Sequence, residues 1–187
     1  SITIAVLPYT VNYQGRIPSK LSQEQLEESR AQESENYQIS MINYLTQMAN
    51  RKKYLHLDIN VIGQVQIDAM LNKAGIDTLV SSLTNAEIAE AIGVSHVMRG
   101  AVTKTFIMSD EASLALGAVG VLTGEPIYNA TSSLNITNTL VDMDNNRTAF
   151  SQQGTRTTKA TRTDQRALRS VFRPVSYTHL RAHETLV

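Results

Sequence analysis

The sequence contains no cysteine and no tryptophan, and only 5% of its 187 residues are aromatic. Without cysteine the chain forms no disulfide, no thiolate metal site and no catalytic thiol. Its 17 cationic and 17 anionic side chains cancel, which argues against a protein that coats nucleic acid over its whole surface. No apolar run reaches the ~18 residues that a membrane-spanning helix needs. A hydrophobic content of 42% is instead typical of a globular domain.

The last residues differ from the rest of the chain. Val175 to Thr185 read Val-Ser-Tyr-Thr-His-Leu-Arg-Ala-His-Glu-Thr, which resembles a translated sequencing-library adapter. We therefore interpret 1–173 as one domain with a truncated C-terminus and 174–187 as a non-native tail. The alternative is a natural tail in which His179 and His183 ligate a metal. At the front, Ser1 has no leader before it, so we expect a removed signal segment or a start inside the gene.

The first part of the chain predicts a strand and a long helix. Ile2 to Leu7 is an apolar, β-branched run, typical of a buried strand. Residues 9–20 contain several turn formers and are predicted to form a loop. Ser22 and Gln25 form a capping box that begins a helix running to about Lys53. Acidic residues near its start and basic residues at its end match the helix dipole.

This helix is predicted to pack unevenly. Its first half is mostly polar, so we expect it to project or to pack only lightly, and to be free to dock a partner. Its second half carries one apolar stripe at helical spacing. The stripe consists of Tyr37, Met41, Tyr44, Leu45 and Met48.

The middle of the chain predicts a strand and two short helices. In residues 55–61 apolar and polar side chains alternate, as in a half-buried strand. Short helices are predicted over Val65–Ala74 and Asn85–Ile92, each ended by a glycine that suits the left-handed position after a helix. The second helix opens with a capping box of Thr84 and Glu87.

The C-terminal part predicts strands and a closing helix. Val94 to Ile107 reads as a strand in which Gly100 marks a bulge or a close approach. Asn129–Val141 and Thr148–Thr158 are rich in threonine and serine and predict a hairpin. A closing helix is predicted from Thr163 to Arg173. The element order predicts an α+β or α/β fold: a single mixed β-sheet with helices packed on it and a long first helix.

Three segments together resemble a known family. They are the opening Ile4–Pro8, the block Leu83–Val102, in which a short helix delivers a strand, and the hairpin Leu134–Ser151 around an Asp-Asn-Asn turn. Over about Ile2 to Arg173 the chain resembles bacterial envelope lipoproteins of the CsgG-like (curli-secretion) and LpoB-like (penicillin-binding-protein-activator) group. It is similar to Bacteroidetes periplasmic lipoproteins of unknown role within that group.

The resemblance implies a compact domain that binds another envelope protein and has no catalytic centre, cofactor or metal. It also implies a periplasmic location, with anchoring to the outer membrane through a lipidated Cys upstream of this sequence. One alternative is a subunit of a curli-type outer-membrane secretion channel, which would form ring oligomers. An enzyme of unknown class is the remaining alternative.

The segment Asp142–Asn146 begins like a calcium-binding loop, with oxygen ligands at alternate positions. The position that needs glycine holds Arg147, and the position of the closing carboxylate holds Gln153. A hairpin turn therefore explains the segment better.

The glycine-rich segment Ser113–Gly124 matches neither the dinucleotide nor the P-loop pattern, and no lysine follows to meet a phosphate. We interpret it as a small-residue segment packed on the sheet. Contact with the membrane as part of a barrel hairpin, and an oligomer interface, are the alternatives.

The remaining candidate groups are histidines and arginines. His56 and His96 lack the spacing of a metal helix or an acid–base motif and are interpreted as strand or surface residues, so we predict no catalytic residue. An arginine stripe on one helical face is interpreted as a solvated surface, with contact to an anionic surface as the alternative. No aromatic interleaves it for base stacking, so no nucleic acid partner is expected. The stripe consists of Arg162, Arg166, Arg169 and Arg173.

Overall fold

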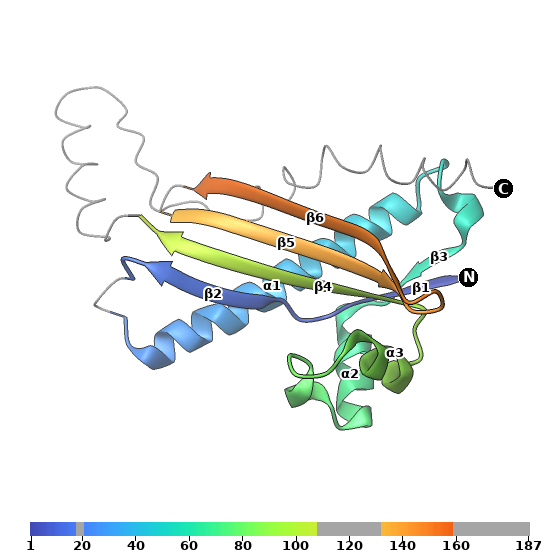
Figure 1. Cartoon of the computed structure of the whole chain (residues 1–187), viewed down its shortest axis with the longest axis horizontal. Coiled ribbons are helices and arrows are strands. Elements are labelled where there is room, and N and C mark those ends of the chain that lie inside the picture. Colours follow the sequence, from blue (N-terminus) through green and yellow to red (C-terminus); the bar gives the residue numbers. More distant parts are fainter. Residues whose placement is uncertain (18–20, 108–131, 159–187) are drawn as a thin grey trace.

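The computed structural model describes residues 1–17, 21–107 and 132–158 (Figure 1). It confirms the α+β class: the strands form one mixed sheet, and helices that include a long first helix pack on it. Short 3-10 turns lie at Leu55–Leu57 and Asp77–Leu79. The other elements, in chain order, are β1 (Ile2–Val6), β2 (Thr10–Gly15), α1 (Gln23–Ala49), β3 (Ile59–Val61), α2 (Gln64–Ala74), α3 (Asn85–Ile92), β4 (His96–Phe106), β5 (Ser132–Asp142) and β6 (Arg147–Thr158).

The strand order is β3-β1-β4-β5-β6, and β2 pairs with β4 beyond the end of β1. β1 runs parallel to β3 and β4, and β2 runs parallel to β4. The strands β4, β5 and β6 form an antiparallel meander. β1 pairs with the first residues of β4, and β2 pairs with its last residues. The segments before and after Pro8 therefore both lie alongside β4.

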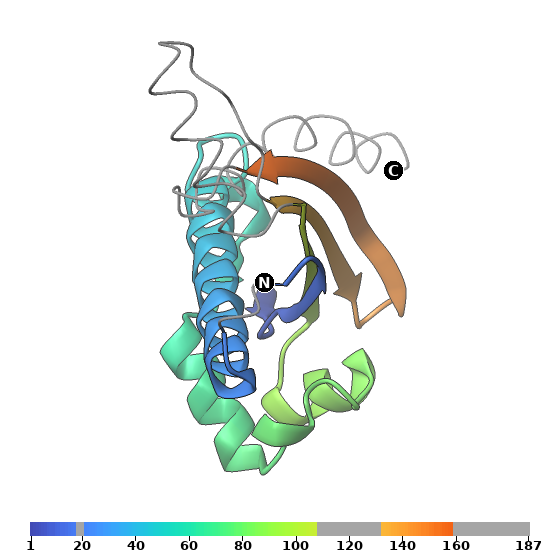
Figure 2. The same cartoon turned by 90° about the vertical axis from the view of Figure 1, so that its left-hand side faces the viewer.

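Helices cover the two faces of the sheet unequally. Figure 2 shows α1 along one face, and no described helix over the opposite face of β5 and β6. The helix α2 packs against α1, β1 and α3, and α3 packs against β4. The helix α1 contributes the fully buried Tyr37 and Met41 to the core, and Tyr44 and Leu45 pack against it half-buried, which confirms these members of the predicted apolar stripe.

The close approach predicted at Gly100 is confirmed, and Tyr9 is the residue that approaches. A Cβ atom at Gly100 would overlap the Tyr9 ring. That ring stacks on Tyr37 at a centroid distance of 5.8 Å, and its hydroxyl donates a hydrogen bond to Asn138 Oδ1. Burial raises the pKa of the Tyr9 hydroxyl, so it stays protonated and remains a donor.

The loop predicted over residues 9–20 is wrong for its first half, because Thr10–Gly15 forms β2. The buried Val11 and half-buried Tyr13 alternate there with exposed Thr10 and Asn12. The alternation was visible in the sequence. Asn12 and Gly15 nevertheless favoured a loop in the sequence analysis, because both residue types occur in loops more often than in strands.

The strand predicted over residues 55–61 is reduced to Ile59–Val61. Asp58 adopts a left-handed conformation with φ of 46°, which breaks the pleat, and Leu55 is 59% exposed. The helix α1 likewise ends at Ala49, before the basic residues that were predicted to lie in its last turn. The chain leaves the helix there, and Tyr54, five residues later, is buried with 6% of its surface exposed.

The first half of α1 was predicted to project or to pack only lightly, and it packs lightly, with most of its residues exposed. Leu26 is buried, and Ser34 donates a 2.6 Å hydrogen bond to the carbonyl oxygen of Tyr9. Glu33 forms a half-buried ion pair with Lys104, with 2.9 Å between Oε1 and Nζ. This half of the helix therefore packs on β2 and β4 through polar contacts, which a search for apolar stripes does not detect.

The predicted helix boundaries are otherwise confirmed. Both capping boxes form, Ser22 with Gln25 and Thr84 with Glu87. Gly75 and Gly93 follow α2 and α3 in the left-handed conformation. The closing helix, the arginine stripe, Ser113–Gly124 and the boundary near Pro174 lie outside the described residues and stay predictions.

Replacing Gly100 with alanine should lower the free energy of unfolding by about 1–3 kcal/mol, because the new methyl group displaces the buried Tyr9 ring. The measurement is a denaturant titration monitored by circular dichroism. Gly63→Ser is the matched control, since a side chain at Gly63 meets nothing within 4 Å and serine is a good N-cap for α2. Equal stability of the Gly100→Ala variant and the wild type would contradict the packing described.

Candidate functional site

The segment Asp142–Asn146, which begins like a calcium-binding loop, forms the hairpin turn between β5 and β6. Asp142 accepts hydrogen bonds from the backbone N–H of Asn145 at 3.2 Å and from its Nδ2 at 2.7 Å. Its Oδ2 also lies 3.5 Å from Nε of Arg147. Gln153 stands opposite Thr137, well along β6. The Asp142 carboxylate is occupied within the turn, which confirms the hairpin interpretation.

The Asp142 turn predicts a pH dependence. The side-chain hydrogen bond from Asn145 is the main cause that lowers the pKa of Asp142 in the folded protein. A lowered folded pKa stabilises the fold above the unfolded value of 3.8, and this stability is lost as the pH falls through the folded pKa.

Asn145→Ala should therefore reduce the stability measured at pH 7 and flatten its decline below about pH 4. Thermal unfolding across this pH range checks the effect. Asn50→Ala, at an exposed position after α1, should keep the wild-type acid profile. An unchanged acid profile in Asn145→Ala would show that the turn does not set the pKa of Asp142.

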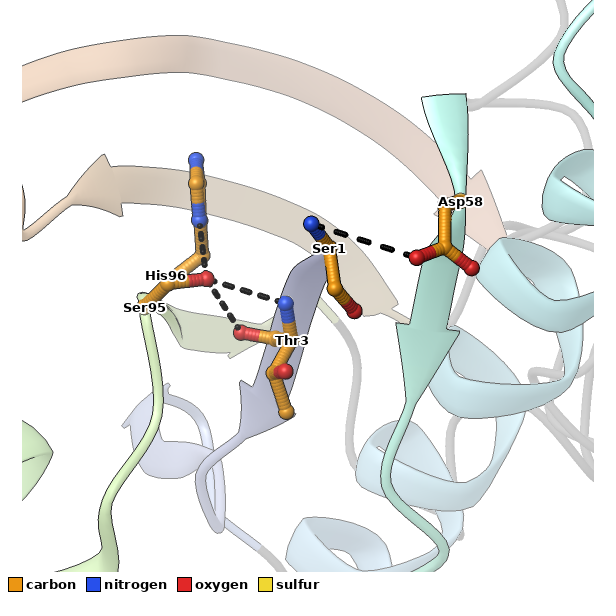
Figure 3. A network of polar contacts seen from close by, with 5 residues as sticks. All are labelled: Ser1, Thr3, Asp58, Ser95 and His96. Atoms are coloured by element: carbon orange, nitrogen blue, oxygen red, sulfur yellow. Dashed lines mark hydrogen bonds and ion pairs between the residues drawn. The ribbon is translucent and has the colours of Figure 1, made fainter. Parts of the chain in front are cut away.

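The structure brings together a serine, a histidine and an aspartate, the residue types of a hydrolase triad. His96 and Asp142 are register partners on β4 and β5. Oγ of Ser95 lies 2.9 Å from Nδ1 of His96 (Figure 3). These three residue types could form a hydrolase triad only if the Ser95 hydroxyl is free to act as the nucleophile, so the hydrogen bonds of that hydroxyl decide whether this is a catalytic site.

The Ser95 hydroxyl is engaged with the backbone of β1. It accepts a 2.9 Å hydrogen bond from the N–H of Thr3 and donates a 3.2 Å hydrogen bond to the carbonyl oxygen of the same residue (Figure 3). With its one hydrogen on the Thr3 carbonyl, the Ser95 hydroxyl has none to give to Nδ1 of His96. The arrangement ties β1 to the start of β4 and lacks the proton path of an activated nucleophile.

The other histidine takes no part in this arrangement. His56 is exposed in the 3-10 turn after α1. Within residues 1–17, 21–107 and 132–158, no group of three ligand-type side chains is placed to hold a metal ion. The described helices also include none that is long and apolar enough to cross a membrane.

Ser95→Ala should destabilise the fold by about 1–3 kcal/mol, because the half-buried Thr3 N–H loses its acceptor. Chemical denaturation measures this loss. Ser81→Ala, at an exposed position, is the matched control and should keep the wild-type stability. Retained stability combined with lost esterase activity in Ser95→Ala would reverse the assignment and make Ser95 a nucleophile.

The most distinctive surface is the sheet face that points away from α1. Tyr13 and Lys104 point toward α1, where they meet Arg30 and Glu33, so the alternate residues of these strands point away. All of those residues on β2, β6 and the open parts of β4 and β5 are uncharged. We call this set the polar face: Thr10, Asn12, Gln14, Ala101, Thr103, Thr105, Ser133, Asn135, Thr137, Thr139, Ser151, Gln153, Thr155 and Thr157.

The polar face is open and regular. Its residues on β2 and β6 are exposed, and those on β4 and β5 are half-buried by their neighbours. Strand pairing places them in rows, such as Asn12, Thr103, Asn135 and Thr155. Gln153 donates a 3.3 Å hydrogen bond to Asn135, so part of the polar surface is ordered by its own contacts.

The edge of β6 is a second open feature. The strand ends the sheet order, and no described strand pairs with its outer side (Figure 1). It spans 12 residues without proline, aspartate, glutamate or lysine. Proline and charged residues are among the features with which proteins protect an edge strand from pairing, and on β6 the charged residues are Arg147 and Arg156.

Solved structures offer only distant likenesses. No family model and no curated protein matches the sequence. The chain is similar to lipoprotein GNA1162 from Neisseria meningitidis at 11% identity and a TM-score of 0.49, covering 91% of this chain and 92% of that one. It is similar to the LpoB C-terminal domain from Escherichia coli at 12% identity and 0.37, covering 84% and 83%.

A third similar structure is the PelC dodecamer from Paraburkholderia phytofirmans, at 13% identity and a TM-score of 0.43, covering 90% of this chain and 80% of that one. An LpoB domain is thus among the similar structures. At these scores the likenesses assign no function to this chain. The CsgG-like and adapter resemblances stay predictions.

Proposed function

We propose that this chain is a non-catalytic domain of a bacterial envelope lipoprotein, and that it binds another envelope protein which adds a strand at the edge of β6. The domain is proposed to lie in the periplasm, held at the outer membrane by a lipidated Cys upstream of Ser1. The observation that carries the proposal is the outer edge of β6, with which no strand of the described residues pairs.

The chemistry of an open edge favours a polypeptide partner. An edge strand presents N–H and carbonyl groups at the spacing of another strand, and added strands use these main-chain groups for affinity. Arg147 and Arg156 are the charged residues of β6, and they stand near opposite ends of the strand. A partner strand therefore meets a long central stretch without charge.

Two neighbouring proline variants test the edge directly. Consecutive N–H groups of a strand point to opposite sides, so only one of Thr155 and Arg156 donates toward β5. Both side chains are exposed, which makes the two positions a matched pair. Proline at the inward-facing position should lower the thermal midpoint, and proline at the outward-facing position should leave it nearly unchanged.

The partner is detected in cells by a photo-reactive amino acid at Gln153, which is exposed on β6, with the same group at Gln47 on α1 as the control. We expect one discrete adduct with an envelope protein, formed from Gln153 alone. The proline variant that keeps its thermal midpoint should abolish this adduct. An adduct that survives that variant would contradict binding at the edge.

Size-exclusion chromatography with and without detergent tests the alternative. A monomeric domain under both conditions fits the proposal. Detergent-dependent ring oligomers would instead favour the curli-type channel subunit, whose proposed membrane segment Ser113–Gly124 falls between the antiparallel neighbours β4 and β5.

A further inference from the structure

The polar face has a composition that the proposed protein contact at β6 does not explain. Charged residues make up 18% of the chain, and the exposed side of α1 carries several of them. On the same side of the sheet, Arg99 of β4 is the register partner of Thr139, and its guanidinium donates to the carbonyl oxygens of Val80 and Leu83 and to Oδ1 of Asn85. No charged residue lies among the polar-face positions themselves. Its side chains are almost all hydroxyls and primary amides, which donate and accept hydrogen bonds without charge.

This chemistry is a poor match for most macromolecular partners. Nucleic acids and anionic lipid surfaces are bound through clustered Lys and Arg, and the face has neither. The centre of a protein interface is enriched in aromatic residues, Met and Arg and depleted in Ser. The face has no aromatic residue and no Met. Insertion into a membrane needs an apolar surface, which the threonine hydroxyls prevent.

A neutral, hydroxyl-rich ligand is the match that remains. A charged ligand would lose part of its hydration at this surface and meet no opposite charge to compensate. A neutral ligand has no such desolvation cost of a charge. Within a row, neighbouring side chains stand about 4.8 Å apart, the spacing between strands, so donors and acceptors recur in steps across β2, β4, β5 and β6. A polymer of similar units can contact several rows at once.

The geometry points to the polar face as a binding site for a neutral glycan strand, recognised by hydrogen bonds from the threonine hydroxyls and the asparagine and glutamine amides. Thr137 and Asn135 on β5 form its centre, with Thr155 and Gln153 beside them on β6. The site is separate from the β6 edge: the glycan contacts side chains of the face, and the protein partner contacts main-chain groups.

The probe is a soluble, neutral oligomer of N-acetylglucosamine, whose hydroxyls and amides complement the face. The full chain is titrated with it while amide and methyl NMR signals are followed. We expect saturable binding with shifts concentrated on outer residues of β5 and β6. A neutral glucose oligomer tests whether the amide is needed, and an anionic polyuronate tests the preference for neutral ligands.

Two variants locate the site. Thr155→Glu places an unpaired carboxylate on the exposed part of the face and should weaken binding by about tenfold or more. Thr137→Val removes a central hydroxyl at constant shape and should weaken binding by a smaller factor. Gln47→Glu makes the same charge change on the exposed side of α1 and should bind like the wild type. Thermal unfolding confirms that each variant is folded.

Absence of saturable binding by both neutral oligomers would overturn the inference. Binding that both face variants leave intact, or equal binding of the polyuronate, would overturn it as well. Either result is distinct from failure of the protein-binding proposal, which is read as a protein adduct in cells. Because Gln153 and Thr155 also belong to the polar face, glycan binding is measured on chains that carry neither the photo-reactive group nor a proline substitution.

Discussion

Tyr9 joins β4, β5 and α1. Its ring lies on Gly100 of β4 and stacks on Tyr37 of α1, while its hydroxyl reaches Asn138 of β5. Its carbonyl oxygen receives Ser34 from the first half of α1. The junction between β1 and β2 is thereby held against the helix and the centre of the sheet. The Tyr9 ring fills the space above Gly100, and its hydroxyl is the hydrogen-bond donor to Oδ1 of Asn138. A change at any one of these three positions therefore affects the other two.

The long helix uses two kinds of contact along its length. Its second half packs Tyr37 and Met41 into the core, where burial of apolar surface stabilises the fold. Its first half meets the sheet through the ion pair of Glu33 with Lys104 and through Arg30 above the Tyr13 ring. Such contacts stabilise less than apolar packing, yet they orient the polar half of the helix along β2.

The groups that suggest chemistry are used to hold the chain together. Ser95 and His96 fasten β1 to β4, and Asp142 closes the turn between β5 and β6. What the described residues leave open is a strand edge and an uncharged sheet face. These two surfaces differ in the groups that they present, main-chain amides on the edge and side-chain hydroxyls on the face. They therefore suit two ligands of different chemistry.

The sequence by itself determined the features that depend on neighbouring residues. The capping boxes at Ser22 and Thr84 and the glycines that end α2 and α3 appear where they were predicted, because caps act within one helical turn. The hairpin of β5 and β6 also followed from local turn chemistry.

Only the tertiary structure decided that residues 10–15 form a strand, because β2 is stabilised by β4, which lies far along the chain. It likewise decided that Tyr9 fills the space at Gly100 and that the polar half of α1 packs. The uncharged face arose in the same way, from strands that are distant in sequence, since alternation along each strand gives no information about its neighbours until pairing aligns them.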